Sequence, residues 1–185
     1  MALFQPFRAL GYVADDVPFA INRRGKEHFV TISVGKAWQI YNCAKITLVF
    51  VGPQLEKRIR ALACKGDLTY AASGKNIVVS KRAKVEGTWS GHTGKVNFIL
   101  ALSDYVLSLG EDSRLLVWQS GNYDGPVKDM QLPEGVTPSA IAHPPTYLNK
   151  VVVGSEEGPL YLYNFSSEKL IYTFKYAPGA VPPAE

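Results

Sequence analysis

Short apolar runs separated by polar turns extend along the whole chain, and long amphipathic helical patterns are missing. The runs ITLVF (46–50), NIVVS (76–80) and KVVVG (150–154) are rich in β-branched residues, and Gly, Asp, Asn and Ser fill the segments between such runs. This combination is typical of β-strands joined by tight turns. The pattern therefore predicts an all-β fold.

A turn followed by a strand recurs along the chain at a nearly constant interval. In four copies the turn residue precedes the end of the strand by six positions: Gly35 and Tyr41, Gly74 and Ser80, Asp112 and Trp118, Glu157 and Tyr163. The strand ends at positions 41, 80, 118 and 163 lie 39, 38 and 45 residues apart. Such a period, about 40 to 45 residues, is typical of WD propeller blades, which have four strands each.

The runs around these positions group into four units of four strands, with the first strand of the first unit expected near VPFAIN (17–22). We therefore predict a partial WD40-type β-propeller of about four four-stranded blades, forming an incomplete ring. The propeller is expected to span residues 1–174, with blades ending near 50, 90, 132 and 174. Prolines in residues 175–185 block strand pairing, and we expect a disordered tail there.

A histidine, a serine and an aspartate occur close together in residues 91–120, and the same residue types form hydrolytic triads. In WD repeats they belong instead to a hydrogen-bonded tetrad that ends in a tryptophan, and the spacing here resembles that tetrad. Its predicted members are His92, Ser108, Asp112 and Trp118. The indole N–H only donates, so a buried Trp118 requires an acceptor, and His92 can donate to Asp112 while accepting from Ser108. We predict a structural network in the third blade.

The catalytic alternative uses Ser108 as a nucleophile with His92 and Asp112. Ser108 falls within an expected strand, and no G-x-S-x-G elbow is present, so the spacing favours a scaffold and no enzymatic activity. A phosphate-binding loop at HTGKV is excluded because Trp89 stands where its first glycine is required. Histidines are dispersed and no carboxylate pair has acid/base spacing, so we expect no metal, no cofactor and no small-molecule substrate.

The composition indicates a cellular compartment and gives the net charge of the chain. The chain is 46% hydrophobic and 19% charged, with net charge +4 and pI near 9.0, which suits a globular domain able to contact nucleic acid. Cys43 and Cys64 fit neither a disulfide framework nor a zinc motif, and free thiols suit the cytosol or nucleus. From the apolar runs and the N-terminal residues we expect neither a membrane-spanning segment nor a secretory signal.

Three basic clusters are candidate interaction sites, each expected near a loop or strand edge at a similar position in its blade. They are Arg23, Arg24 and Lys26; Lys57, Arg58 and Arg60; and Lys81, Arg82 and Lys84. One interpretation is a solvated charged rim that protects strand edges. The other is contact with RNA phosphates or an acidic protein surface. The loop HPPTYLN (143–149) is interpreted as a structural turn, with an exposed docking loop as the alternative.

Three longer segments resemble one family. PFRALGYVADDVPFAI (6–21), VGKAWQIYNCAKITLVFVG (34–52) and HPPTYLNKVVVGSEEGPLYLYN (143–164) are similar to the N-terminal part of the Utp21/WDR36 family of WD-repeat subunits of the small-subunit processome. The resemblance implies a nucleolar, non-enzymatic scaffold of the U3 small nucleolar ribonucleoprotein. It also implies a role in pre-rRNA processing and 40S subunit biogenesis. The implied partners are other WD-repeat proteins of the processome, with U3 RNA or pre-rRNA contacted weakly or indirectly.

Members of that family are longer, with two propellers and a helical C-terminal domain, so we expect this chain to be a fragment with two exposed blade faces. Two other functions remain open from the residues. A generic WD adaptor for a ubiquitin ligase or signalling assembly would share the fold. A hydrolase would need an accessible Ser108.

Overall fold

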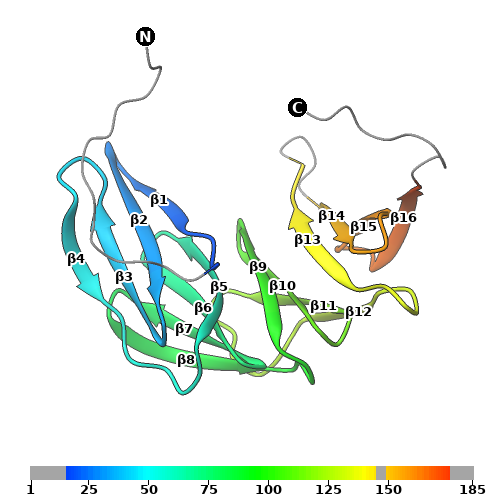
Figure 1. The fold of residues 1–185 in the computed structure, drawn as a ribbon, viewed down its shortest axis with the longest axis horizontal. Helices are drawn as coiled ribbons and strands as arrows, with labels where there is room; N and C mark the ends of the chain where they lie inside the picture. The colour runs from blue at the N-terminus through cyan, green and yellow to red at the C-terminus, as the bar shows by residue number, and fades with distance from the viewer. Residues whose placement is uncertain (1–15, 145–148, 176–185) are drawn as a thin grey trace, which may run out of the picture. The chain divides into compact units, whose positions relative to one another are not determined.

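The computed structural model describes residues 16–144 and 149–175, and every regular element in this part of the chain is a β-strand (Figure 1). Four antiparallel sheets of four strands follow one another along the sequence. Each described strand hydrogen-bonds only to strands of its own sheet, in chain order. The prediction of an all-β fold made of four four-stranded blades is confirmed. The chain divides into two compact units, unit 1 (Met1–Ser90) and unit 2 (Gly91–Glu185), with two sheets each.

The strand bounds are as follows. Unit 1 contains β1 (Ala20–Arg24), β2 (Glu27–Val34), β3 (Ala37–Asn42), β4 (Thr47–Val51), β5 (Ile59–Lys65), β6 (Leu68–Ser73), β7 (Asn76–Lys81) and β8 (Lys84–Ser90). Unit 2 contains β9 (Val96–Leu102), β10 (Tyr105–Gly110), β11 (Arg114–Gln119), β12 (Lys128–Gln131), β13 (Pro138–Ala142), β14 (Lys150–Ser155), β15 (Leu160–Asn164) and β16 (Lys169–Phe174). The predicted tail, apart from residue 175, lies outside the described residues, as do residues 145–148 of the HPPTYLN loop.

The four residues that define the sequence period occupy equivalent places. Each lies on the third strand of its sheet, one residue before the strand ends: Tyr41, Ser80, Trp118 and Tyr163. Across the sheet they pair with Val30, Thr69, Val106 and Val151, respectively. In three sheets a register shift toward the fourth strand directly precedes the period residue, at Ile40/Tyr41, Val79/Ser80 and Leu162/Tyr163. The period in the sequence therefore reflects a repeated backbone geometry as well as repeated side chains.

The turn glycines of unit 1 have a conformational reason. Gly35 and Gly74 join the second strand of each sheet to the third, and their φ angles are +63° and +66°. Only glycine adopts this left-handed region without steric cost, and two-residue hairpin turns require it. In unit 2 the corresponding turns are wider and carry Asp112 and Glu157.

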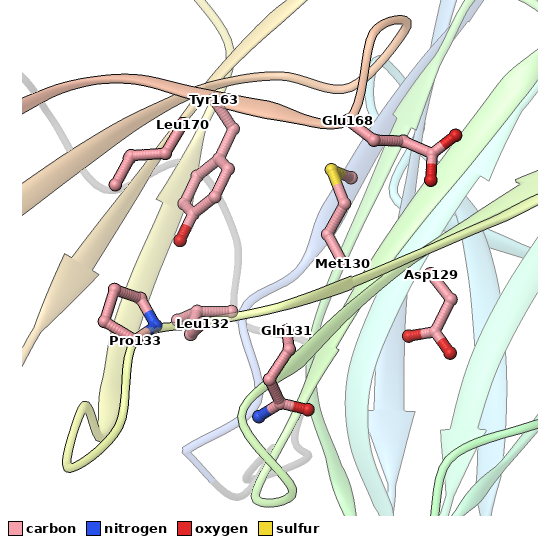
Figure 2. Close-up of a pocket in the computed structure, with 8 residues that line it drawn as sticks. All are labelled: Asp129, Met130, Gln131, Leu132, Pro133, Tyr163, Glu168 and Leu170. Atoms are coloured by element: carbon pink, nitrogen blue, oxygen red, sulfur yellow. The ribbon is translucent and has the colours of Figure 1, made fainter.

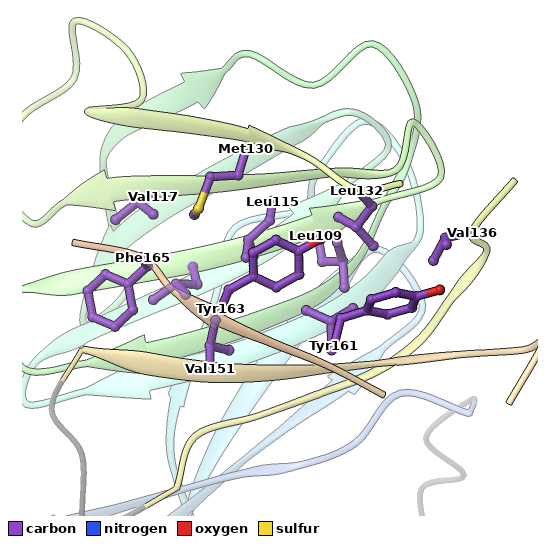
Figure 3. Packing of buried hydrophobic residues seen from close by; sticks show 12 residues of the cluster. Leu109, Leu115, Val117, Met130, Leu132, Val136, Val151, Tyr161, Tyr163 and Phe165 are labelled. Carbon is purple, nitrogen blue, oxygen red and sulfur yellow. The ribbon is translucent and has the colours of Figure 1, made fainter. Parts of the chain in front are cut away.

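Each unit has its own hydrophobic core between its two sheets. In unit 1, Trp38 and Ile40 of β3 pack with Ile59, Leu62 and Ala71 of the following sheet. Alternate residues of a strand point to opposite faces, so one face of each sheet supplies these side chains. The core of unit 2 is larger and is drawn in Figure 3. Its members are Leu107, Leu109, Leu115, Val117, Met130, Leu132, Val136, Val151, Val153, Tyr161, Tyr163 and Phe165.

Candidate functional site

Asp112 organises the turn between β10 and β11. Its Oδ2 accepts hydrogen bonds from the backbone N–H groups of Thr93 at 2.8 Å and Gly94 at 3.4 Å. Its Oδ1 lies 3.0 Å from Nδ1 of His92. Burial opposes ionisation of this carboxyl, but the hydrogen bonds from His92 and Thr93 outweigh it and lower the pKa of Asp112. A charged Asp112 therefore joins the segment before β9 to the turn after β10.

His92 continues the network into the interior of the blade. Its Nε2 lies 2.7 Å from Oγ of Ser108, and the indole Nε1 of Trp118 donates to the same oxygen at 2.7 Å. Because the Ser108 oxygen accepts from Trp118, its own proton is free to go to Nε2, and the ring proton of His92 stays on Nδ1 facing Asp112. Burial lowers the pKa of His92, against the opposing effect of Asp112. The structure brings all four predicted members together as one chain of hydrogen bonds.

Two further residues support this network and were not singled out from the sequence. A Cβ at Gly110 would lie 2.6 Å from Asp112 Oδ1 and 2.8 Å from His92 Nδ1, so only glycine fits beside the pair. Arg114 donates from Nη1 to the Gly91 carbonyl at 2.9 Å and from Nε to Asp129 at 3.0 Å. The only feature of the sequence that could have indicated Gly110 and Arg114 is that both residues flank the Asp112 turn.

The geometry does not offer Ser108 to a substrate. Ser108 and Trp118 are fully buried, and His92 is 4% exposed. A serine nucleophile needs an accessible hydroxyl and an oxyanion site beside it. Here the hydroxyl already has both a donor and an acceptor. The arrangement connects strands and leaves no exposed reactive group.

The other sheets keep only parts of this chemistry. In unit 2, Glu157 takes the place of Asp112 and accepts the backbone N–H of Thr137 at 3.1 Å. Hydrogen bonds from its own backbone and from Thr137 lower the pKa of Glu157. In the described residues, the buried side-chain polar atoms without a hydrogen-bond partner include Ser33 Oγ, Trp38 Nε1, Ser80 Oγ and Tyr163 Oη. Outside the third blade, packing rather than a complete hydrogen-bond network therefore stabilises these positions.

A groove in unit 2 lies between β12 and the β15–β16 hairpin, with a volume of about 400 Å³. Figure 2 shows Asp129 and Glu168 on one side of it and Pro133 on the other. Both carboxylates already hold cations of the chain, since Arg114 pairs with Asp129 and Lys128 with Glu168 at 2.9 Å. The groove therefore presents no unpaired charge to a ligand.

The three basic clusters occupy different blade positions, so the expectation of a shared position was wrong. Arg23, Arg24 and Lys26 lie at the turn between the first two strands of a sheet; Lys81, Arg82 and Lys84 lie at a turn between third and fourth strands. Lys57, Arg58 and Arg60 lie at and just before the start of β5. Arg24 pairs with Asp67 at 2.8 Å and Arg82 with the same carboxylate at 3.5 Å. The cluster at residues 23–26 and the cluster at residues 81–84 therefore meet at Asp67, and the cluster at residues 57–60 lies elsewhere.

The two cysteines are free thiols. Cys43 is exposed, whereas Cys64 is partly buried and donates to Thr31 Oγ1 at 3.1 Å. Burial raises the pKa of the Cys64 thiol, so it is less ionised than an ordinary cysteine. Residues 16–144 and 149–175 contain no helix long and apolar enough to cross a membrane.

Repeated four-stranded antiparallel sheets, with a His–Ser–Asp–Trp network in one of them, define a WD-type β-propeller protein. The fold is shared with a chain in the crystal structure of the mitotic checkpoint complex. That likeness has a TM-score of 0.70 at 17% identity and covers 79% of this chain and 47% of that one.

Residues 30–184 match the family described as the WDR36/Utp21 first beta-propeller, and the chain belongs to this family. It is 35% identical over 176 residues to human (Homo sapiens) WD repeat-containing protein 36, covering 94% of this chain. It is 33% identical over 180 residues to the Schizosaccharomyces pombe U3 small nucleolar RNA-associated protein 21 homolog, again over 94% of this chain. The Saccharomyces cerevisiae U3 small nucleolar RNA-associated protein 21 is 28% identical over 99% of it. The chain spans 20% of the length of each of these relatives.

Proposed function

We propose that this chain is a non-enzymatic scaffold segment of the U3 small nucleolar ribonucleoprotein and small-subunit processome, supporting pre-rRNA processing and 40S subunit biogenesis. The family match over residues 30–184 carries the proposal, together with relatives whose names associate them with U3 small nucleolar RNA. The partners are other WD-repeat proteins of that assembly, and the site of action is the nucleolus. The generic adaptor role is not favoured, because the checkpoint-complex likeness at 17% identity extends to the fold alone.

The scaffold role, as opposed to catalysis, is supported by the burial of the third-blade network. Ser108 lies beside a histidine and an aspartate, as a serine nucleophile would, but it is inaccessible and fully hydrogen-bonded. Its surroundings stabilise a blade, and blades present surfaces to partners. Fluorophosphonate labelling of Ser108 in the folded protein would contradict this part of the proposal.

Co-purification tests the assembly. The tagged chain is expressed in cells, and the recovered RNA is probed for U3 and, as an internal control, for a second small nucleolar RNA of the same structural class. We expect enrichment of U3 over the control RNA, together with other WD-repeat processome proteins by mass spectrometry. Recovery of a cullin complex without U3 enrichment would favour the adaptor role instead.

A further inference from the structure

The mild overall charge of the chain conceals two units of opposite sign. Residues 1–90 contain 14 Lys and Arg against 6 Asp and Glu, a net charge of +8. Residues 91–185 contain 6 Lys and Arg against 10 Asp and Glu, a net charge of −4. A net charge of this size on a small unit creates a field that attracts polyanions. The charge therefore favours unit 1 as the place of a polyanion-binding surface.

Seven of the 14 Lys and Arg residues of unit 1 lie at one end of its sheets, where three turns meet. Asn22 Nδ2 donates to the Gly66 carbonyl, Arg24 Nη2 donates to the same oxygen at 3.0 Å, and Arg24 also pairs with Asp67. Arg82 reaches Asp67 from the β7–β8 turn. We call this end the basic turn surface. Its cationic residues are Arg23, Arg24, Lys26, Lys65, Lys81, Arg82 and Lys84.

Few acidic groups neutralise the basic turn surface. Asp67 is shared between two arginines, and Glu27 accepts from Asn42 at 3.2 Å. Lys26, Lys81 and Lys84 are exposed and form no ion pair with any residue in the described ranges. Three lysine ammonium groups thus remain available to an anionic partner.

The β7–β8 turn carries this charge at a local cost. Lys81 and Lys84 face each other across the strand pair, and like charges placed directly opposite are destabilising. Between them Arg82 has a φ of +55°, in the left-handed region that favours glycine or asparagine. The positive φ recurs at Ile46 and Glu168 in the corresponding turns of two other sheets, so only the facing lysines are particular to this turn. This lysine pair is consistent with a binding role for the charge.

The chemistry of the surface favours a nucleic-acid backbone over an acidic protein. Protein interfaces are depleted in lysine and built around apolar or aromatic anchors, whereas nucleic-acid interfaces are more polar and strongly positive. The large exposed apolar side chains of unit 1 include Ile21, Leu48 and Val51, which lie on strands, and none occupies the turns at 25–26, 66–67 or 82–83. The turns carry no aromatic side chain, so they lack the usual platform for base stacking. Phosphate contact remains.

We infer that the basic turn surface of unit 1 binds the phosphate backbone of RNA, without sequence preference. This inference rests on the charge and geometry of unit 1, and it stands or falls separately from the association with U3. Phosphate contacts by Lys and Arg release counterions, so the affinity falls steeply with salt.

A pair of matched triple variants locates the site. K26E/K81E/K84E removes the three lysines of the basic turn surface. K36E/K57E/K75E removes three lysines from the opposite end of the same sheets, where the Lys57 N–H donates to Ser73 Oγ at 3.1 Å beside the β6–β7 turn. Both variants change the net charge equally, so a difference between them reports position. All six lysines are exposed, and circular dichroism confirms that both variants fold.

Binding of the full chain to a fluorescent single-stranded RNA of mixed sequence is measured by anisotropy between 50 and 300 mM salt. At 0.1 M salt, three lost phosphate contacts correspond to roughly 100-fold weaker binding and a salt slope smaller by about 2. We expect this loss in K26E/K81E/K84E, with the control triple close to the unaltered chain. Equal losses in both triples, or no RNA binding by the unaltered chain, would overturn the inference. Binding of poly-glutamate in preference to RNA would overturn it in favour of an acidic protein.

Discussion

The buried indole N–H of Trp118 donates to the hydroxyl of Ser108 at 2.7 Å. That hydroxyl in turn reaches His92 Nε2 at 2.7 Å, so one oxygen satisfies two buried groups from two other segments of the blade. In a fully buried site a polar group left without a partner costs about 1–3 kcal/mol. The Ser108 side chain is therefore small in volume but large in its effect on stability.

Ser108→Ala is expected to lower the free energy of unfolding by about 1–3 kcal/mol, because Trp118 Nε1 and His92 Nε2 both lose their partner. Ser80→Ala is the matched control. Ser80 is also a fully buried strand serine, and its hydroxyl has no hydrogen-bond partner in the described part of the chain. Urea unfolding of both variants, followed by circular dichroism, should show a loss for Ser108→Ala only. Equal effects would mean that the hydroxyl of Ser108 is not stabilising.

The His92 side chain makes stability depend on pH. Its folded-state pKa lies below the ordinary 6.5, so the unfolded chain binds more protons than the folded chain. This contribution is fully present above about pH 6.5 and is lost as the pH falls toward the folded-state pKa. His92→Gln replaces the imidazole with an amide that can still donate and accept hydrogen bonds but does not titrate. We expect unfolding free energy to fall more steeply between pH 7 and 5 in the unaltered chain than in the variant; parallel curves would contradict this.

Asp112 acts in the same direction at lower pH. Its folded-state pKa is also lowered, so the stability it contributes is present above its ordinary pKa of 3.8 and is lost on further acidification. The two windows are distinct, but the hydrogen bond from His92 helps to lower the pKa of Asp112, so His92→Gln removes the upper window and also alters the lower one.

A substitution at Gly110 tests how tightly the fold encloses His92 and Asp112. Gly110→Ala would place a Cβ 2.6 Å from Asp112 Oδ1, and such overpacking typically costs about 1–3 kcal/mol. Gly154→Ala is the matched control, a buried glycine near the end of the second strand of its sheet whose Cβ would meet neighbours at 3.3 Å or more. Thermal unfolding should separate the two variants clearly. A Gly110→Ala protein as stable as Gly154→Ala would show that the turn can open without cost.

The repeat could be predicted from the sequence because each blade is a local unit. The turn-to-strand spacing around Trp118 and Tyr163 depends on residues within one hairpin, and hairpin geometry follows from alternation and turn chemistry. The tetrad was predictable for the same reason, since its donor and acceptor types recur at fixed spacing. Gly110 was not, because its requirement arises from two side chains that meet only in the folded blade.

Long-range convergence was less predictable. Arg24 and Arg82 are far apart in the chain, and their common contact with Asp67 depends on how the two sheets of unit 1 pack. The three basic clusters look alike in the sequence, which suggested a shared blade position. Lys57 and its neighbours lie at the start of a first strand, whereas the other two clusters lie at turns at the other end of the sheets, and this difference is visible only once the strands are known. A run of charged residues is visible in the sequence, whereas the tertiary fold decides which of these runs lie close together.

Tyr41 and Tyr163 occupy the same place in two sheets but differ in their hydroxyl groups. The Tyr41 hydroxyl donates to Gln39 Oε1 at 2.6 Å, whereas the Tyr163 hydroxyl is buried without a partner in the described residues. Burial raises the pKa of Tyr163 to about 12, so its phenol stays neutral at physiological pH. Removing an unpaired buried hydroxyl relieves a desolvation penalty, whereas removing a paired one loses a hydrogen bond of about 1 kcal/mol. Tyr163→Phe is therefore expected to be neutral or stabilising and Tyr41→Phe destabilising, as measured by chemical denaturation. A larger loss of stability for Tyr163→Phe than for Tyr41→Phe would contradict this. It would mean that the Tyr163 hydroxyl has a hydrogen-bond partner in solution and that more than packing stabilises this position of the fourth blade.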